Sequence, residues 1–254
     1  MVSKIQSSIG DETVRRKNVS FLVLLGLLVV MTACGKQNQT EFMRVKKEDV
    51  DTKKENWMDK QLLLSAQLGD TETVVKLINS GANLNVRGTQ GETPVMAATY
   101  YNHIDTVKTL LAAGADVNIQ DNHKDNPFLY AAAEGTLEIL KLTIEAGADP
   151  KIMNQFGDTA LIPAAERGHV EVVKELLTYT DIDVNHINNL GWTALMEAVL
   201  LGSGGKEYQQ IVQMLIEHNA DVNIPDKEGV TPFQHAKERG FTKIQPILEK
   251  VGAY

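Results

Sequence analysis

The chain has 254 residues, which fits one sizeable domain with appended segments, and its formal net charge is −8. Most of the acidic excess lies after residue 56, so this surface would repel a phosphate backbone, which argues against nucleic-acid binding. The single cysteine excludes an intramolecular disulfide and a metal site built on several cysteines.

The first segment reads as an export signal. Arg15, Arg16 and Lys17 precede the apolar run 21–31, which is too short to span a hydrocarbon core of about 30 Å as a helix. A basic stretch, a short apolar stretch and then small residues is the layout of a secretory signal peptide. Translation could start at Met1 or at Val14, and both starts keep this layout.

The end of this segment, Met31-Thr-Ala-Cys34-Gly35, resembles the lipobox of bacterial lipoproteins, although Met31 stands where leucine is commoner. The resemblance implies that the Cys34 thiol receives a diacylglycerol and becomes the mature N-terminus. We therefore expect a signal peptide over 1–33 and a lipid anchor on the extracytoplasmic side of a bacterial membrane, either periplasmic or at the cell surface. The alternative is an uncleaved short anchor. A buried free cysteine does not fit the position of Cys34, which follows an apolar segment and precedes a polar one.

Residues 35–56 are polar and show no sustained hydrophobic period. Such a composition cannot bury enough apolar surface to offset the entropy of ordering the chain. We expect residues 34–56 to be the acylated cysteine followed by a flexible tether.

From residue 57 the sequence repeats itself in two independent registers. One element, Gly-Ala-Asn-Leu-Asn in its first copy, starts at Gly81, Gly114, Gly147, Asp181 and Asn219. The other is a Thr or Asn, often followed by proline, at Thr93, Asn126, Thr159, Thr193 and Thr231. Both show the same spacings, and a period of this length indicates stacked helical repeats.

Each repeat carries the signals of a helix pair. The Thr or Asn suits a helix N-cap, and the proline after it suits the first helical position. Alanine pairs such as Ala97-Ala98 keep the first helix thin, and glycines such as Gly135 and Gly202 suit its left-handed end. One helix pair cannot bury its own apolar face, so the units must stack.

These residues resemble the ankyrin repeat over about 198 of 254 residues, most closely in the run from Gly157 to Leu177. The resemblance implies an all-α solenoid of stacked helix-turn-helix units joined by β-hairpin loops. We place the domain at 57–254, with repeats at 57–87, 88–120, 121–153, 154–187, 188–225 and 226–254. Polar Gln245 and Glu249, at positions where other repeats are apolar, mark the last repeat as a terminal cap.

Three departures from the pattern affect the expected fold. Lys124 stands where other repeats have a turn glycine, which predicts a distorted hairpin tip. Five extra residues, including Gly202–Gly205, lengthen the turn between the helices of the fifth repeat. Pro163 should kink a first helix or lie in its first turn.

The chain offers little catalytic chemistry. No two of its six histidines have the i, i+4 spacing of a helical metal site, and no strained nucleophile turn precedes a serine. One aspartate per repeat (Asp116, Asp149, Asp183, Asp221) indicates turn formation. We predict a non-enzymatic protein without cofactor or metal. The alternatives are a hydrolase-like enzyme using the Gly-rich insertion or His123 with Asp125, and a translocated effector, which a lipid anchor would retain.

The resemblance implies binding on a concave face of hairpin tips and first helices, where several of the few aromatic residues fall. The predicted contact residues are Tyr100, Tyr101, His123, Asp125, Phe156, Asp158, Glu166, Arg167, Leu190, Trp192, Leu200 and Leu201. Leu190, Leu200 and Leu201 beside Trp192 would form one apolar patch, unless some of these side chains fold inward. We expect a monomeric domain that binds an unidentified protein, with acidic residues steering basic partners.

Overall fold

The computed structural model describes residue 44 and residues 57–253. The chain divides into two units, Met1–Asn56 and Trp57–Tyr254. The predicted signal peptide, the lipid site at Cys34 and the tether lie outside the described residues. None of the helices that are described is long and apolar enough to cross a membrane.

The second unit is built of short helices. Residues 57–68 are helical. The following helices are α2 (Thr71–Asn79), α3 (Pro94–Tyr100), α4 (Ile104–Ala112), α5 (Pro127–Glu134), α6 (Leu137–Glu145), α7 (Leu161–Glu166), α8 (Val170–Tyr179), α9 (Ala194–Leu200), α10 (Lys206–Glu217), α11 (Pro232–Glu238) and α12 (Gln245–Glu249). The unit is therefore an all-α stack of helix pairs, as the sequence predicts.

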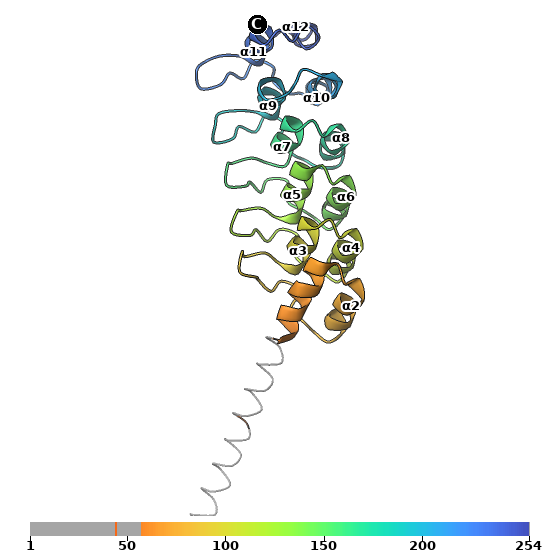
Figure 1. Cartoon of the computed structure of the whole chain (residues 1–254). Coiled ribbons are helices and arrows are strands. Elements are labelled where there is room, and N and C mark those ends of the chain that lie inside the picture. The colour runs from red at the N-terminus through yellow and green to blue at the C-terminus, as the bar shows by residue number, and fades with distance from the viewer. Residues whose placement is uncertain (1–43, 45–56, 254) are drawn as a thin grey trace, which may run out of the picture. The chain divides into compact units, whose positions relative to one another are not determined.

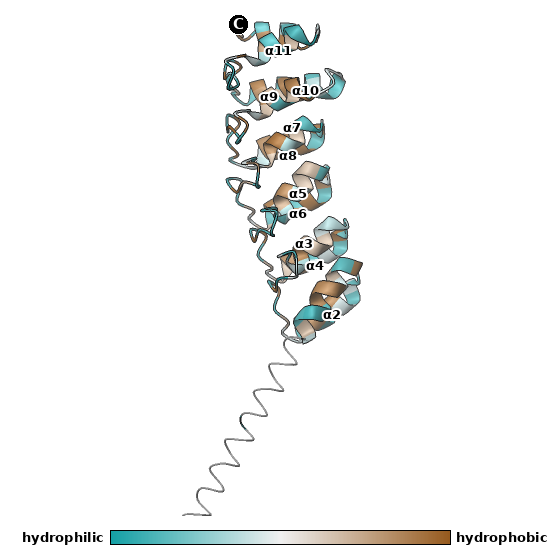
Figure 2. Ribbon diagram, turned by 60° about the vertical axis from the view of Figure 1, so that its left-hand side comes forward, coloured by the Kyte–Doolittle hydropathy of each residue, from teal (hydrophilic) through white to brown (hydrophobic). Residues whose placement is uncertain are grey.

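The helices form two parallel columns (Figure 1). The first helices of the repeats, α3, α5, α7, α9 and α11, make one column, and the second helices, from α2 to α12, make the other. The connecting loops project from the side of the first helices that faces away from the second helices (Figure 1). Hydrophobic positions lie mainly in the helices, layer after layer along the stack (Figure 2). This is how stacked units bury a continuous core.

One column of the core consists of aliphatic side chains at the same place in successive second helices, and the first helices supply further buried side chains such as Phe128 and Leu195. Fully buried members of this column are Val74, Val107, Leu140, Val173 and Val212. The column ends at Gln245, which is half-buried and donates its amide to the carbonyl of Ala236 at 3.2 Å, while Glu249 is exposed. The predicted polar end of the last repeat is confirmed.

The expected β-hairpin loops are tight turns, and no strand occurs among the described residues. In the third repeat two backbone bonds close the turn, from Asp121 N–H to Asp125 (2.8 Å) and from Lys124 N–H to Asp121 (3.1 Å). The turn is too short for a β-ladder to form between its two arms. Lys124 adopts a φ of +62°, close to the +73° of Gly91, so the expected distortion of this tip is wrong. The lysine takes up a left-handed conformation that costs about 1–2 kcal/mol.

Four of the five predicted N-caps, Thr93, Asn126, Thr193 and Thr231, accept a backbone N–H with their side chains, and Thr159 does not. The hydroxyl of Thr193, for example, accepts the N–H of Met196, three residues further along the chain, at 3.2 Å. The hydroxyl of Thr159 is buried without a partner. Pro163 lies in the first turn of α7 and has no N–H to donate to the Thr159 carbonyl, which accepts from Ile162 at 3.2 Å instead. The proline therefore tightens the first turn and removes its cap.

The fifth-repeat insertion divides between a turn and a helix. Residues 201–205 form the turn, and α10 has 12 residues against 9 in α4 and α6. Gly204, with a φ of +73°, takes the left-handed conformation. The expectation that Gly202 would do so is wrong, because the longer turn shifts the left-handed residue from Gly202 to Gly204. Arg239, the C-cap residue of α11, donates to the carbonyl of Gly202 at 3.2 Å and holds the insertion against the last repeat.

Side-chain bonds link each repeat to the next. Nε2 of His169 lies 3.1 Å from the carbonyl of Ala133 in the preceding repeat. The turn aspartates act as the sequence predicts, since Asp149 accepts the N–H of Lys151 at 2.9 Å. The N–H of Asp149 donates to Asn118 of the preceding repeat at 2.8 Å. Such ladders fix the register between units.

Candidate protein-binding surface

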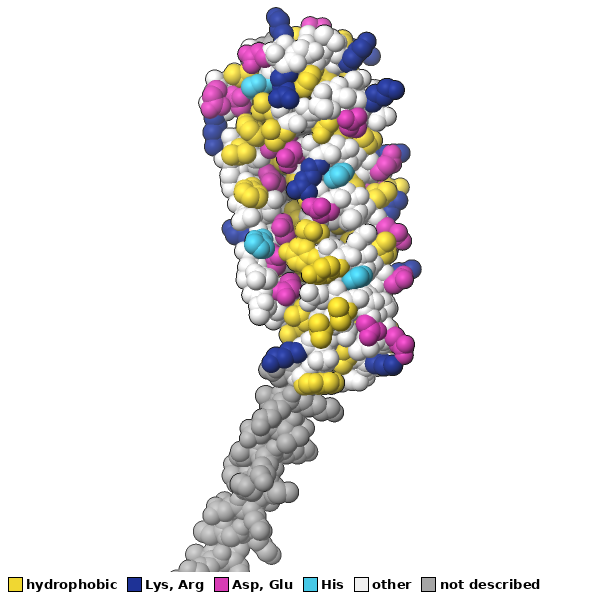
Figure 3. Space-filling view, viewed as in Figure 1, with side chains coloured by type: hydrophobic (Ala, Val, Ile, Leu, Met, Phe, Trp, Pro, Cys, Tyr) yellow, Lys and Arg dark blue, Asp and Glu magenta, His cyan; other side chains and the backbone are white. Residues whose placement is uncertain are grey.

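We call the surface made by the loop tips and the first helices the hairpin face. Acidic side chains run in a line along its middle, with hydrophobic and basic side chains beside them (Figure 3).

One polar residue organises each loop tip from the third repeat onward. A single side-chain oxygen of this residue accepts two backbone N–H groups of its own loop. The residues in this role are Asp121, Asn154, Asn188 and Asp226. The loops are thereby rigid supports for side chains at their tips.

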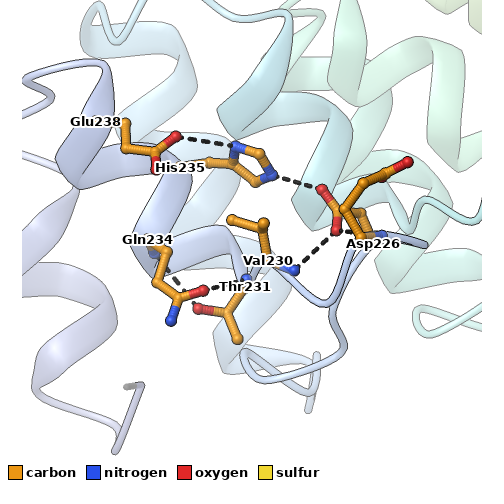
Figure 4. A network of polar contacts seen from close by, with 7 residues as sticks. Asp226, Val230, Thr231, Gln234, His235 and Glu238 are labelled. Atoms are coloured by element: carbon orange, nitrogen blue, oxygen red, sulfur yellow. Dashed lines mark hydrogen bonds and ion pairs between the residues drawn. The ribbon is translucent and has the colours of Figure 1, made fainter.

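In the last repeat this organising residue, Asp226, also bonds to His235 of the first helix, α11 (Figure 4). Asp226 accepts the N–H of Glu228 at 3.0 Å and of Val230 at 2.8 Å, and its other oxygen lies 2.7 Å from Nε2 of His235. Glu238 lies 4.0 Å from the other ring nitrogen. Burial raises the pKa of Asp226, but the bonds from His235 and Val230 outweigh burial and hold it below its ordinary value. The arrangement resembles a catalytic dyad, yet its carboxylate is occupied by the backbone.

In the fifth repeat the amide of Asn188 joins two carboxyl groups. Its nitrogen donates to Asp158 at 2.9 Å and to Glu197 at 3.2 Å. Glu197, on α9, is 4% exposed, and its second oxygen is buried without a hydrogen-bond partner. Burial, and then the charges of Glu166 and Asp158, raise the pKa of Glu197 to about 7, against the opposing bond from Asn188.

A second carboxyl group with a raised pKa lies two repeats away. Burial, and then the charge of Asp121, raise the pKa of Asp125 to about 6, while His123 and Arg167 oppose the shift. Asp158 adds to the rise as well. The carboxyl groups of three successive repeats therefore act on one another across the middle of the hairpin face.

The predicted aromatic anchors differ in exposure. Tyr100 is half-buried, donates its hydroxyl to Asp121 and packs edge-on against Tyr130 with ring centroids 4.6 Å apart. Burial and the bond to Asp121 raise its pKa. Tyr101 is 57% exposed and stacks on His103. Tyr100 is thus part of the support for a loop, and Tyr101 is the more accessible of the two.

The apolar side chains of the fourth and fifth repeats are more open. Phe156 is 58% exposed and Leu190 53%, and both stand at the same position of adjacent loop tips. A bond of 3.1 Å from Asn189 N–H to the Phe156 carbonyl joins these tips. Leu201 is 51% exposed at the end of α9. Trp192 and Leu200 are half-buried.

The remaining predicted residues are charged or polar side chains that differ in exposure. Arg167 is exposed and pairs with Glu134 at 2.6 Å. Glu166 is half-buried and Asp158 is 9% exposed. His123 is exposed at its loop tip, two repeats from the Gly-rich insertion named in the enzymatic alternative. Within residues 57–253 and at residue 44, no group of three or more His, Cys, Asp or Glu side chains is placed to hold a metal ion.

Sequence reasoning missed Asn188 and Glu197. Asn188 shares the spacing of Asp121 and Asp226, so a third register in the sequence could have identified it. Glu197 has no such signal, because the equivalent first-helix position holds alanine, tyrosine, proline or histidine in other repeats.

The stacked helix pairs, capped first helices and bonded loop tips define a helical-repeat solenoid. A family model described as ankyrin repeats (3 copies) matches residues 27–123 and 128–226. The chain belongs to the ankyrin repeat family.

Known proteins agree with this assignment. The crystal structure of an ankyrin repeat domain from Acinetobacter baumannii AYE is similar at 46% identity and a TM-score of 0.75, covering 76% of this chain and 98% of that one. The ankyrin repeat domain of Bcl-3, a member of the IkappaB protein family, is similar at 25% identity and a TM-score of 0.69, covering 76% and 86%. The ankyrin repeat protein YahD of Escherichia coli (strain K12) is 50% identical over 80 residues, 32% of this chain and 40% of the relative's length. The fold is one that serves protein–protein interaction in general.

Proposed function

We propose that this protein is a binding module that holds a partner protein on its hairpin face and is anchored by lipid at Cys34 on the extracytoplasmic side of a bacterial membrane. The assignment of the binding surface rests on the exposure of Phe156 and Leu190, which lie on adjacent loop tips joined by a backbone hydrogen bond. Exposed apolar side chains that lie side by side mark interaction sites, and aromatic residues are enriched at protein interfaces.

Truncating these two tips tests the binding surface. In the double variant Phe156→Ala with Leu190→Ala, affinity for the partner captured by the wild-type chain should fall by about thirtyfold or more, as for a hot-spot loss of about 2 kcal/mol. The domain should keep its melting temperature, since both side chains are exposed.

Tyr179→Ala is the matched control. Tyr179 is 67% exposed but ends the second helix α8, away from the loop tips. It should leave affinity unchanged. A double variant that binds its partner as tightly as the wild type would remove the loop tips from the binding surface.

The lipid anchor has its own test at Cys34. Cys34→Ala should abolish labelling by a fatty-acid probe and move the protein from the membrane to the soluble fraction, because two acyl chains supply stable anchoring. Thr40→Ala, a nearby polar change, should alter neither property. Retention of the Cys34 variant in the membrane at wild-type levels would contradict the anchor.

A further inference from the structure

We propose that the hairpin face recognises a basic polypeptide segment, whose Lys or Arg side chains lie over a row of carboxyl groups that we call the acidic strip. The acidic strip consists of Asp121, Asp125, Asp158, Glu166 and Glu197. This inference rests on the proposed function, because it names the chemistry of the partner at the same surface.

The first support is that the strip has no cation of its own. Across the described part of the chain, no Lys or Arg forms an ion pair with any of its five members. The basic groups beside it have other partners. Arg167 pairs with Glu134, Arg87 donates to the carbonyl of Gln120 at 2.7 Å, and Lys227 donates to the carbonyl of Asn189 at 2.7 Å.

The second support is the state of Glu197. Its side chain is 4% exposed, and one of its two oxygens is buried with no hydrogen-bond partner. A buried carboxyl group left half-satisfied costs free energy in the isolated domain. Buried carboxyl groups with shifted pKa values cluster at functional sites, where a bound ligand can supply the missing partner.

The third support is mutual repulsion within the strip. The pKa of Glu197 is raised to about 7 by burial and then by Glu166 and Asp158. Helix α9, which carries Glu197, packs on α7, α10 and α11. Asn188 donates to Glu197 at 3.2 Å, His235 of α11 is already bonded to Asp226, and Tyr208 of α10 donates to the Glu166 carbonyl at 3.1 Å. These neighbours bring no cationic side chain that offsets the repulsion, so an incoming cation would favour the charged carboxylate.

Asp125 repeats the pattern at the other end of the strip. Its pKa is raised to about 6 by burial and by Asp121 and Asp158, against His123 and Arg167. Because a bound cation favours the ionised form of each carboxyl group, binding of a basic segment should release protons. Affinity should therefore rise with pH between about 5 and 8.

Exposure fixes how the partner meets the strip. Asp125 and Glu166 are half-exposed, so a cationic side chain contacts them directly. Asp158 and Glu197 are buried and add charge from a desolvated position, where electrostatic attraction is stronger than in water. Phe156, in the same loop as Asp158, is exposed. The segment that fits combines basic and apolar residues.

The probe is a fluorescein-labelled, unstructured peptide of Arg, Leu and Ser, with a matched peptide in which Gln replaces every Arg. Fluorescence anisotropy with the purified chain at pH 8 should show about tenfold tighter binding of the Arg peptide. That preference should shrink by about threefold at pH 5, as the raised carboxyl groups take up protons.

Two charge-matched double variants locate the effect. Asp125→Asn with Glu166→Gln should lower affinity for the Arg peptide by about tenfold at pH 8. Glu171→Gln with Glu217→Gln removes the same charge from exposed positions on the second helices α8 and α10, and should keep wild-type affinity. Both variants should melt cooperatively, which a circular-dichroism scan checks.

The outcomes separate this inference from the proposed function. Equal binding of the two peptides, or equal losses in both double variants, would overturn the acidic strip as a recognition site. If that occurs while the Phe156 and Leu190 variant still loses its captured partner, the hairpin face remains a binding surface and only the basic chemistry of the partner is wrong. A response to Mg²⁺ alone that matches the response to the Arg peptide would also overturn recognition of a polypeptide.

Discussion

Leu176→Ala should destabilise the repeat domain by about 2–5 kcal/mol, because it opens a cavity in the middle of the stack. Leu176 is fully buried on α8, and that helix packs on α6, α7 and α10. In a solenoid each unit is stabilised mainly by its two neighbours, so damage at an interior repeat weakens both of its interfaces. Urea unfolding followed by circular dichroism measures the loss.

Two variants bracket this result. Leu177 is half-buried and packs against the edge of the core, although the repeat pattern by itself would place it inside, so Leu177→Ala should cost less than Leu176→Ala. Glu249→Ala changes an exposed residue of the last helix and should stay within about 0.5 kcal/mol. Equal losses at Leu176 and Glu249 would mean that the helix register is wrong.

The fold could be predicted because its determinants recur. Caps such as Thr93 and Thr193, and core residues such as Val107 and Val173, return at nearly constant spacing, so each repeat confirms the others. A single departure was harder to interpret. Lys124 predicts a distorted loop, but the bond from its own N–H and the two backbone bonds to Asp121 hold the loop in the geometry of its neighbours.

The candidate site could be predicted only in part. The positions of the loop tips follow from the repeat, so the sequence predicts Phe156 and Leu190 on this surface, and both are exposed. The bond between Tyr100 and Asp121 joins adjacent repeats and leaves no periodic trace. Glu197 likewise belongs to one repeat alone, and its unusual state depends on burial and on neighbouring charges that only the three-dimensional arrangement supplies.

Glu197→Gln should stabilise the domain at pH 8 and have little effect at pH 4. The pKa of Glu197 in the folded state is about 7, above its ordinary value of 4.5, so the folded state binds this proton more tightly than the unfolded chain does. The stability that the protonated group contributes is complete below pH 4.5 and is lost as pH rises toward 7. Glutamine is neutral throughout and can keep the bond from Asn188, so it removes the loss.

The expected gain at pH 8 is about 1–2 kcal/mol, after allowing for screening by solvent that reaches the half-exposed parts of the strip. Urea unfolding of Glu197→Gln and of the exposed control Glu171→Gln, each at pH 4 and pH 8, measures it. A gain at pH 8 that is no larger than at pH 4 would contradict the raised pKa. Since a residue kept for binding can cost stability, the same variant should also bind the Arg peptide more weakly than the wild type at pH 8. Stability and affinity that move in opposite directions would separate a binding role for Glu197 from a purely structural one.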